Sequence, residues 1–146
     1  MSGILTLGGD SLPAFTGRAS FTALMKANVH RQEEIHVEMM ALVQASKVHG
    51  SALCLQKHLP PSKNWKLRWR VKRGATYSHV LWSDLDNELN ALPIAIRKHY
   101  EQLNRRAAEL NHLDIMVQHT IKWCAIYLGQ QSFRAEPGSV GTESSS

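Results

Sequence analysis

Apolar and basic side chains alternate without a break in residues 64–73. The apolar set is Trp65, Leu67, Trp69 and Val71, and the basic set is Lys66, Arg68, Arg70 and Lys72. Because successive side chains of a strand point to opposite faces, this period of two predicts a β-strand with one apolar and one basic face. Like charges on one face repel each other, so the basic face requires open solvent or an anionic partner. The pattern favours contact with a polyanion, most simply nucleic acid.

The positive charge of the chain is concentrated around this strand. The net charge is +5 and the pI is near 9.5, yet no acidic residue occurs from Met39 through Ser83. Such a patch is typical of a phosphate-binding surface, and the alternative is a solvated face whose charges discourage edge-to-edge association. We favour DNA over RNA as the partner. The candidate contact residues are Lys63, Lys66, Arg68, Arg70, Lys72, Arg73, Tyr77, His79, Arg97, Arg105 and Arg106.

The aromatic residues near this strand admit two interpretations. They could be platforms on which single-stranded bases stack. Tryptophans that alternate with charges are more often the buried side of a half-exposed sheet, so we predict that Trp65 and Trp69 belong to the core. Tyr77 and His79 are predicted to be exposed, since Val80 and Trp82 compete for the inner face of the next strand.

No arrangement of residues predicts catalysis or metal binding. His112 and His119 are two helical turns apart, about 10 Å along the axis, too far to share one ion. Asp84 and Glu88 are spaced to pair on a helix, but acidic residues favour helix N-termini for dipole reasons alone. Phosphate-binding glycine loops and nucleophile motifs are absent from the sequence. We therefore predict a protein that is not an enzyme, with no catalytic residue, metal ion or cofactor.

The remaining elements predict an α+β fold. A helical pattern runs from an N-cap at Ser20 to about His49, with Gly50 as its C-terminal glycine. Residues 51–63 read as a connection with a short extended piece at 52–55. Gly74 allows a tight turn into a second strand, residues 76–82, and a short helix capped by Ser83 and Asp86 follows. We predict two long helices packed antiparallel, with a short helix and a basic two-stranded antiparallel β-hairpin.

The last helix, from about Pro93 to Gly129, carries a narrow apolar seam. Its residues recur in alternating steps of four and three, with Asp114 in one polar slot, as in coiled-coil packing. This seam predicts either packing against the first helix or an interface with a second copy or a protein partner. The apolar members are Ile96, Tyr100, Leu103, Ala107, Leu110, Val117, Ile121, Cys124 and Leu128.

Composition predicts the domain organisation. Residues 1–19 read as an irregular arm, 20–129 as a single α+β domain, and 130–146 as a disordered tail poor in apolar residues. The N-terminus lacks the features of a secretory signal, and no apolar run approaches the roughly 20 residues that span a bilayer. Cys54 and Cys124 are too few for a disulfide framework. The expected location is cytoplasmic, without membrane contact.

Three segments also carry a resemblance. They are Leu-Arg-Trp-Arg, then His-Val-Leu-Trp-Ser-Asp-Leu, then Leu-Pro-x-x-Ile-Arg-x-His-Tyr-x-x-Leu-Asn-Arg-Arg. Over about residues 64–112 this pattern resembles small uncharacterised accessory proteins encoded on bacterial plasmids and integrative conjugative elements. The resemblance implies a mobile-element setting and agrees with the predicted basic hairpin. It assigns no residue a role.

Overall fold

The computed structural model describes residues 17–59 and 65–135, with side chains described through residue 130. The chain divides into two compact units: one holds Met1–Arg31 with Val117–Ser146, and the other holds Gln32–Met116. We refer to them as the helical unit and the sheet unit. The predicted domain, residues 20–129, includes parts of both units, and both long helices contribute residues to each unit. Sequence periodicity shows that a helix is long without showing which stretch of it packs with which partner.

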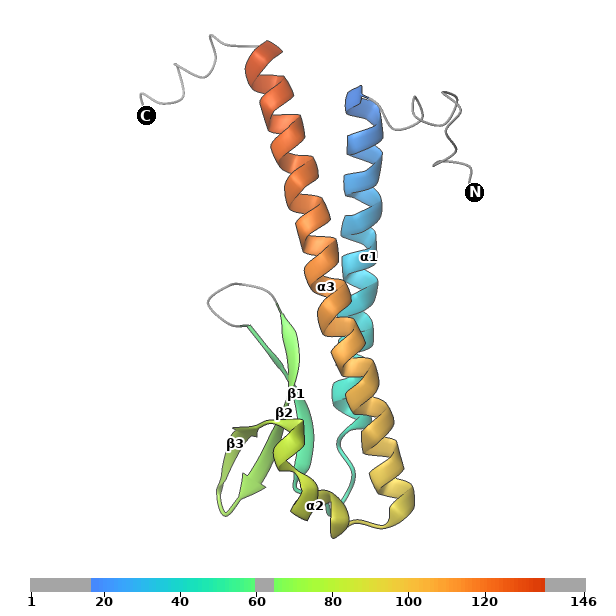
Figure 1. Ribbon diagram of the computed structural model, residues 1–146, viewed down its shortest axis with the longest axis vertical. Coiled ribbons are helices and arrows are strands. Elements are labelled where there is room, and N and C mark those ends of the chain that lie inside the picture. The colour runs from blue at the N-terminus through green and yellow to red at the C-terminus, as the bar shows by residue number, and fades with distance from the viewer. Residues whose placement is uncertain (1–16, 60–64, 136–146) are drawn as a thin grey trace. The chain divides into compact units, whose positions relative to one another are not determined.

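The fold is α+β, as predicted, with two long helices, a short helix and a 3-10 turn accompanying a small antiparallel sheet (Figure 1). The prediction of a two-stranded hairpin is wrong, because the sheet has three strands in the order β1-β2-β3. The elements are α1 (Gly17–Ala45), β1 (Leu53–His58), β2 (Lys66–Arg73), β3 (Thr76–Val80), η3 (Trp82–Asp84), α2 (Asp86–Asn90) and α3 (Ile94–Ala135).

The additional strand is β1, which the sequence analysis read as a connection with a short extended piece. Leu53 and Leu55 are buried and the residues between and after them are more exposed, so β1 has the alternation of a half-buried strand. β1 pairs antiparallel with β2, and β2 pairs antiparallel with β3. The β2–β3 turn is as predicted, since Gly74 has φ +69°, a conformation that glycine adopts without a side-chain clash.

The apolar face of β2 forms the core of the sheet unit. Leu67, Trp69 and Val71 are all buried, which confirms the predicted inner face and the core position of Trp69. The indole of Trp69 meets the ring of Tyr100 edge-on, with centroids 5.5 Å apart, a favourable aromatic geometry. Trp65, also predicted to be core, is only half-buried, and the Lys57 ammonium lies 4.6 Å above its ring.

A buried serine links the end of α1 to the sheet. The Ser46 hydroxyl donates to the Val43 carbonyl at 2.7 Å and accepts from the Leu55 amide at 2.8 Å. α1 ends at Ala45, before the predicted end near His49. Gly50 has the expected positive φ, +84°, but it lies in the connection that follows the helix. The helix also begins earlier than predicted, at Gly17 instead of after Ser20.

Within the sheet unit, α1 and α3 meet through polar as well as apolar side chains. The His36 imidazole lies 2.9 Å from the carboxylate of Asp114, which is fully buried. Glu38, two residues further along α1, pairs with Arg106, eight residues before Asp114 on α3. Because higher numbers on α1 meet lower numbers on α3, the two helices run antiparallel in this unit. The seam predicted on α3 faces inward here: Tyr100, Leu103, Ala107 and Leu110 are buried.

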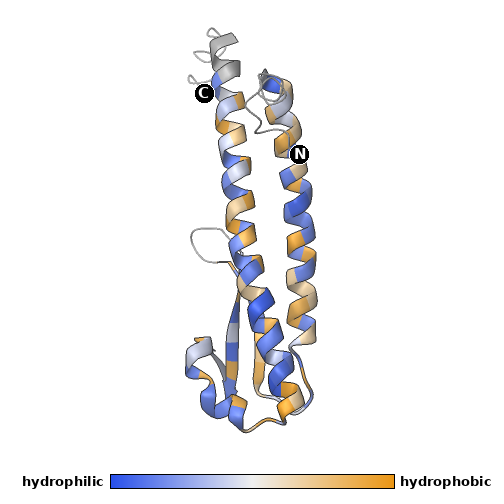
Figure 2. Cartoon of the chain, turned by 45° about the vertical axis from the view of Figure 1, so that its right-hand side comes forward, coloured by the Kyte–Doolittle hydropathy of each residue, from blue (hydrophilic) through white to orange (hydrophobic). Residues whose placement is uncertain are grey.

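The helical unit contains the first part of α1 and the last part of α3. The rings of Phe21 and Tyr127 stack with centroids 4.1 Å apart, and the Arg18 guanidinium donates to the Leu128 carbonyl at 3.1 Å. Figure 2 shows hydrophobic residues interspersed with hydrophilic ones along both helices, as expected for helices with one packed face.

Two predicted helix boundaries are wrong. α3 continues through Gly129 to Ala135, because a helical glycine costs only about 1 kcal/mol relative to alanine and does not by itself stop a helix. The predicted tail, 130–146, therefore starts with helical residues, and residues 136–146 lie outside the described part of the chain, as do residues 1–16.

The Ser83–Asp86 capping box is absent, since Ser83 lies in η3 and Leu85 occupies the N-cap of α2 without a side-chain bond.

Candidate nucleic-acid interface

The register of the sheet gathers basic and aromatic side chains on its outer face. Residues that face each other across the strands share a face, so the outer side chains of β2 are flanked by those of β1 and β3. Arg70, for example, lies between Cys54 and His79. None of these side chains is acidic. We call this set the basic face: Lys66, Arg68, Arg70 and Lys72 of β2, Cys54, Gln56 and His58 of β1, and Tyr77 and His79 of β3.

The sheet holds one arginine of the basic face, Arg70, by hydrogen bonds. The Arg70 guanidinium donates to Gln56 Oε1 at 2.5 Å and to the Tyr77 carbonyl at 2.8 Å, so it bridges from β2 to both neighbouring strands. Arg68 and Arg70 are half-buried, and the Nε of each is buried without an acceptor in the described structure. The sheet therefore fixes the guanidinium of Arg70 by hydrogen bonds and leaves the Nε donor of each arginine unused.

His58, at the edge of the basic face, has a lowered pKa. Loss of hydration, and then the charges of Arg68 and Lys66 with smaller contributions from His79 and Arg70, lower the pKa of the His58 imidazole. A neighbouring cation disfavours a second positive charge. At neutral pH His58 is therefore neutral.

Tyr77 and His79 are exposed, as predicted. The Tyr77 ring lies 5.8 Å from the Arg70 guanidinium and 6.0 Å from the Lys72 ammonium, so two cations border one aromatic face. His79 Nδ1 lies 3.3 Å from the Trp69 carbonyl. An N–H at that nitrogen donates to the carbonyl, which leaves Nε2 as an acceptor when the ring is neutral.

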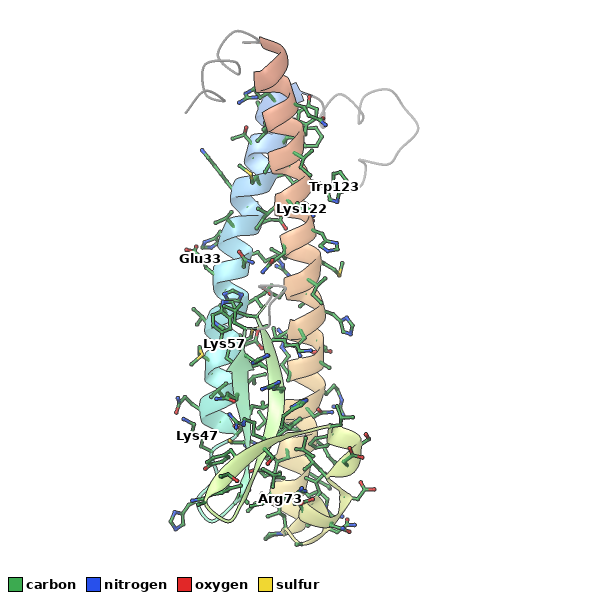
Figure 3. The ribbon with its side chains drawn as sticks, turned by 90° about the vertical axis from the view of Figure 1, so that its left-hand side faces the viewer. Glu33, Lys47, Lys57, Arg73, Lys122 and Trp123 are labelled. Carbon is green, nitrogen blue, oxygen red and sulfur yellow. The ribbon has the colours of Figure 1, made fainter. Side chains whose placement is uncertain are left out.

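The other predicted contact residues that the structure describes are not part of this face. Arg73, at the lower end of the hairpin in Figure 3, pairs with Glu88 at 3.1 Å. Arg97 lies 3.4 Å from Asn90 Oδ1, and Arg105 is exposed on α3. Lys63 lies outside the described residues. Lys57 of β1, labelled in the same view, belongs instead to the Trp65 contact described above.

Arg106, also a predicted contact residue, pairs with acidic side chains and is not part of the basic face. Its guanidinium donates to both carboxylate oxygens of Glu38 and to Glu109. The hydrogen bonds that Arg106 donates to Glu38 and then to Glu109 raise the pKa of Arg106, and the bond that Glu38 accepts from Arg106 lowers the pKa of Glu38. Arg106 is therefore neutralised within the α1–α3 pair. Sequence analysis could not detect this pairing, because 68 residues separate Arg106 from Glu38.

Two asparagines of α3, which the sequence analysis did not single out, position β2. Asn104 Oδ1 accepts from the Trp69 indole at 2.9 Å. Asn111 Oδ1 accepts from the Leu67 amide at 2.8 Å, and its Nδ2 donates to the Leu67 carbonyl at 3.0 Å. The two asparagines are seven residues apart, which is two turns on one helix face. That spacing is the only signal the sequence offers for them.

Asn111 takes the place of a missing strand residue. Lys72 bonds to Ala52 on the β1 side, and antiparallel hydrogen bonding alternates along a strand. The amide and carbonyl of Leu67 therefore point toward β3. Those of Trp69, two residues further along β2, point the same way, and Trp69 pairs with Val80 of β3. Because β3 ends at Val80, no strand residue reaches Leu67, and the Asn111 amide satisfies both backbone groups instead.

The described residues include no group of three or more histidine, cysteine or acidic side chains that could hold a metal ion. Among the helices described, none is long and apolar enough to cross a membrane. Comparison of the chain with protein-family models, with curated proteins and with solved structures found no match.

Proposed function

We propose that the basic face binds nucleic acid through its phosphates, with DNA favoured over RNA, and that the protein acts without catalysis. The observation that carries this proposal is the register: it places Lys66, Arg68, Arg70 and Lys72 on one face, among neighbours that include no acid. Lysine and arginine are the side chains that neutralise phosphates, and arginine can do so with two parallel hydrogen bonds.

The cations of the basic face repel each other, and water alone does not remove this repulsion. Alternate residues of a strand are about 6.6 Å apart, so the four cations on this face lie close enough to repel each other. A bound polyanion turns this repulsion into attraction. The two half-buried arginines gain most, because their surroundings screen charge less than water does.

The biological setting follows from the resemblance over about residues 64–112. It supports a role as an accessory protein of a bacterial mobile element, acting in the cytoplasm. Replication, transfer and integration of such elements all expose DNA to accessory proteins. The helices α1 and α3 then serve as the scaffold that holds β2, through Asn104 and Asn111.

The direct test is binding of fluorescein-labelled 20-mers, single-stranded and duplex, measured by fluorescence anisotropy. Lys66→Ala combined with Lys72→Ala removes two exposed cations of the basic face without touching the half-buried arginines. Lys26→Ala combined with Lys122→Ala is the matched control, since it removes the same charge from exposed positions of the helical unit. We expect weaker binding for the first variant only. Equal weakening of both would mean that net charge, not this face, drives binding.

The alternative interaction, docking of a second copy or a protein partner on the α3 seam, has less support. Leu103 and Leu110 are buried by the chain itself, with 6% and 1% of their surface exposed. A partner would have to displace the neighbours that bury them. A concentration-dependent mass in light scattering, abolished by Leu103→Asp without unfolding, would favour this alternative over the nucleic-acid proposal.

A further inference from the structure

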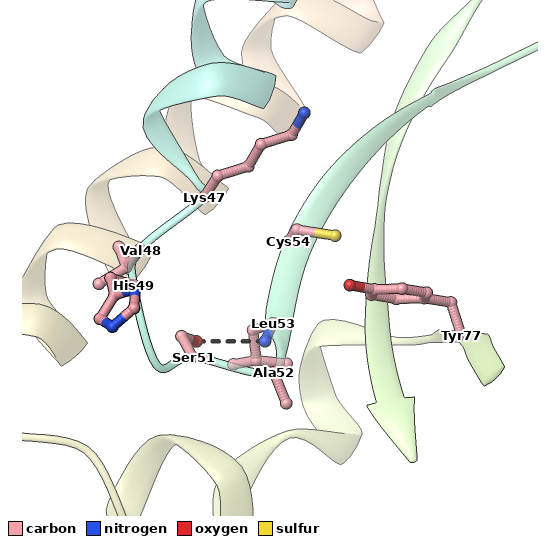
Figure 4. Close-up of a pocket in the computed structure, with 8 residues that line it drawn as sticks. All are labelled: Lys47, Val48, His49, Ser51, Ala52, Leu53, Cys54 and Tyr77. Carbon is pink, nitrogen blue, oxygen red and sulfur yellow. Dashed lines mark hydrogen bonds between the residues drawn. The ribbon is translucent and has the colours of Figure 1, made fainter. Parts of the chain in front are cut away.

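A hollow opens beside the basic face, where the connection after α1 passes β1. It has a volume of about 540 Å³ and is bounded by Lys47, His49, Cys54 and Tyr77, together with the backbone around Ala52. Figure 4 shows Lys47 arriving from the end of α1 and the Tyr77 hydroxyl pointing toward Cys54 across the space between β3 and β1. A second hollow, of about 260 Å³, shares Lys47, Cys54 and Tyr77 and adds Arg70. The two adjoin along Cys54.

The walls of these hollows are cationic. Lys47 and Arg70 come from different elements, and the positive charge of each favours the ionised form of the Cys54 thiol, so both act on the same spot. No acidic side chain lines either hollow in the described structure. The field inside favours an anion.

The walls also exclude two other uses. Burial outweighs the nearby cations and raises the pKa of Cys54, so the thiol is protonated at neutral pH and is a poor nucleophile. The hollows contain no set of metal ligands among their lining residues. What remains is a binding site of ordinary ligand size, with charge at one side and an aromatic ring at the other. The ring is available, because Tyr77 is 48% exposed.

We propose that this site takes one unpaired nucleotide of a bound DNA strand, with its base against Tyr77 and a phosphate between Lys47 and Arg70. This inference rests on the proposed function and extends it: it makes a single strand, or a looped or frayed end, the preferred form of the nucleic acid. A base within a duplex is stacked and paired on both sides and cannot reach the ring without being extruded. Base stacking on an aromatic side chain tolerates any sequence.

The test compares a labelled oligo(dT) 20-mer with a blunt duplex hairpin at one salt concentration. The wild-type protein should bind the single strand more tightly. Tyr77→Ala should weaken single-strand binding by about 5- to 150-fold and weaken duplex binding by a clearly smaller factor, since Tyr77 also belongs to the basic face. Tyr77→Phe keeps the ring and should bind like the wild type. Lys47→Ala should lower the salt dependence of single-strand binding by about 0.7 in log K against log salt.

Several results would overturn the inference. Equal weakening of both substrates by Tyr77→Ala, or none, would reject the nucleotide site while leaving phosphate binding by the basic face intact. No binding of either substrate by the wild-type protein would reject the proposed function itself. Free thymidine monophosphate serves as a further probe. If it competes at the affinity of the strand, the site recognises a small nucleotide and not a unit of DNA. Circular dichroism melting shows whether each variant is folded.

Discussion

Replacing Asn111 by leucine tests whether a side chain of α3 holds β2 in place. In the native structure the Asn111 amide bonds both the N–H and the C=O of Leu67, at 2.8 and 3.0 Å. Leucine has a similar size but offers neither a donor nor an acceptor. It also fills the space, so that water does not easily replace the missing amide.

The expected effect follows from these two bonds. A buried donor or acceptor left without a partner costs about 1–3 kcal/mol, and Leu67 is buried, with 4% of its surface exposed. Asn111 itself is only half-buried, which allows some rehydration and favours the lower part of the range for each group. We expect Asn111→Leu to lower the free energy of unfolding by about 2–4 kcal/mol.

Urea unfolding followed by circular dichroism measures this change in stability. His112→Leu, an exposed neighbour on the same helix, is the matched control and should change stability by less than about 0.5 kcal/mol. Hydrogen exchange supplies the local readout: the Leu67 amide should be protected in the wild type and should exchange much faster in Asn111→Leu. A variant as stable as the control, with Leu67 still protected, would refute the role assigned to Asn111.

Three further predictions concern the sheet unit. His36→Ala removes the 2.9 Å partner of the buried Asp114 carboxylate and should lower the free energy of unfolding by about 1–3 kcal/mol in urea titrations; an unchanged midpoint would contradict it. Leu110→Asp places a carboxylate at a position with 1% exposure and should abolish the cooperative thermal transition, whereas a normal melt would show that the seam tolerates charge. Loss of hydration and then the nearby cations lower the pKa of His58 in the free protein, and phosphates that offset those cations should raise it. By linkage, affinity should then increase as pH falls through the bound-state pKa of His58 and level off above it, and an NMR titration of its ring that shifts downward, or not at all, on binding would contradict this.

The sequence predicts elements best where one local pattern decides the structure. The strict alternation around Trp69 identified the inner and outer faces of β2, and Gly74 marked the turn. β1 was read as a connection, because its six residues precede the Pro60-Pro61 pair and carry a weaker alternation. Only the pairing with β2 across the intervening segment makes it a strand, and that pairing is not local.

Long-range pairings account for the rest of what the sequence could not show. Arg106 looks like an interface cation until Glu38 is brought to it by the packing of α1 on α3. Asn111 has no sequence signal that sets it apart from other helical asparagines; its role arises because β3 ends two residues too early to pair with Leu67. The hollow beside Cys54 has no sequence signature, since its walls come from the α1–β1 connection, β1 and β3. Each case depends on which segments meet in space.

The central claim, that the basic face neutralises phosphates, is tested most directly by the salt dependence of duplex binding. Removing one cation that neutralises a phosphate should lower the slope of log K against log salt by about 0.9. The structure predicts that Lys66→Ala with Lys72→Ala reduces the slope by about 1.8 relative to the wild type, while Lys26→Ala with Lys122→Ala leaves it unchanged. Equal slopes for the wild type and the basic-face variant, or an equal reduction in both variants, would contradict the claim.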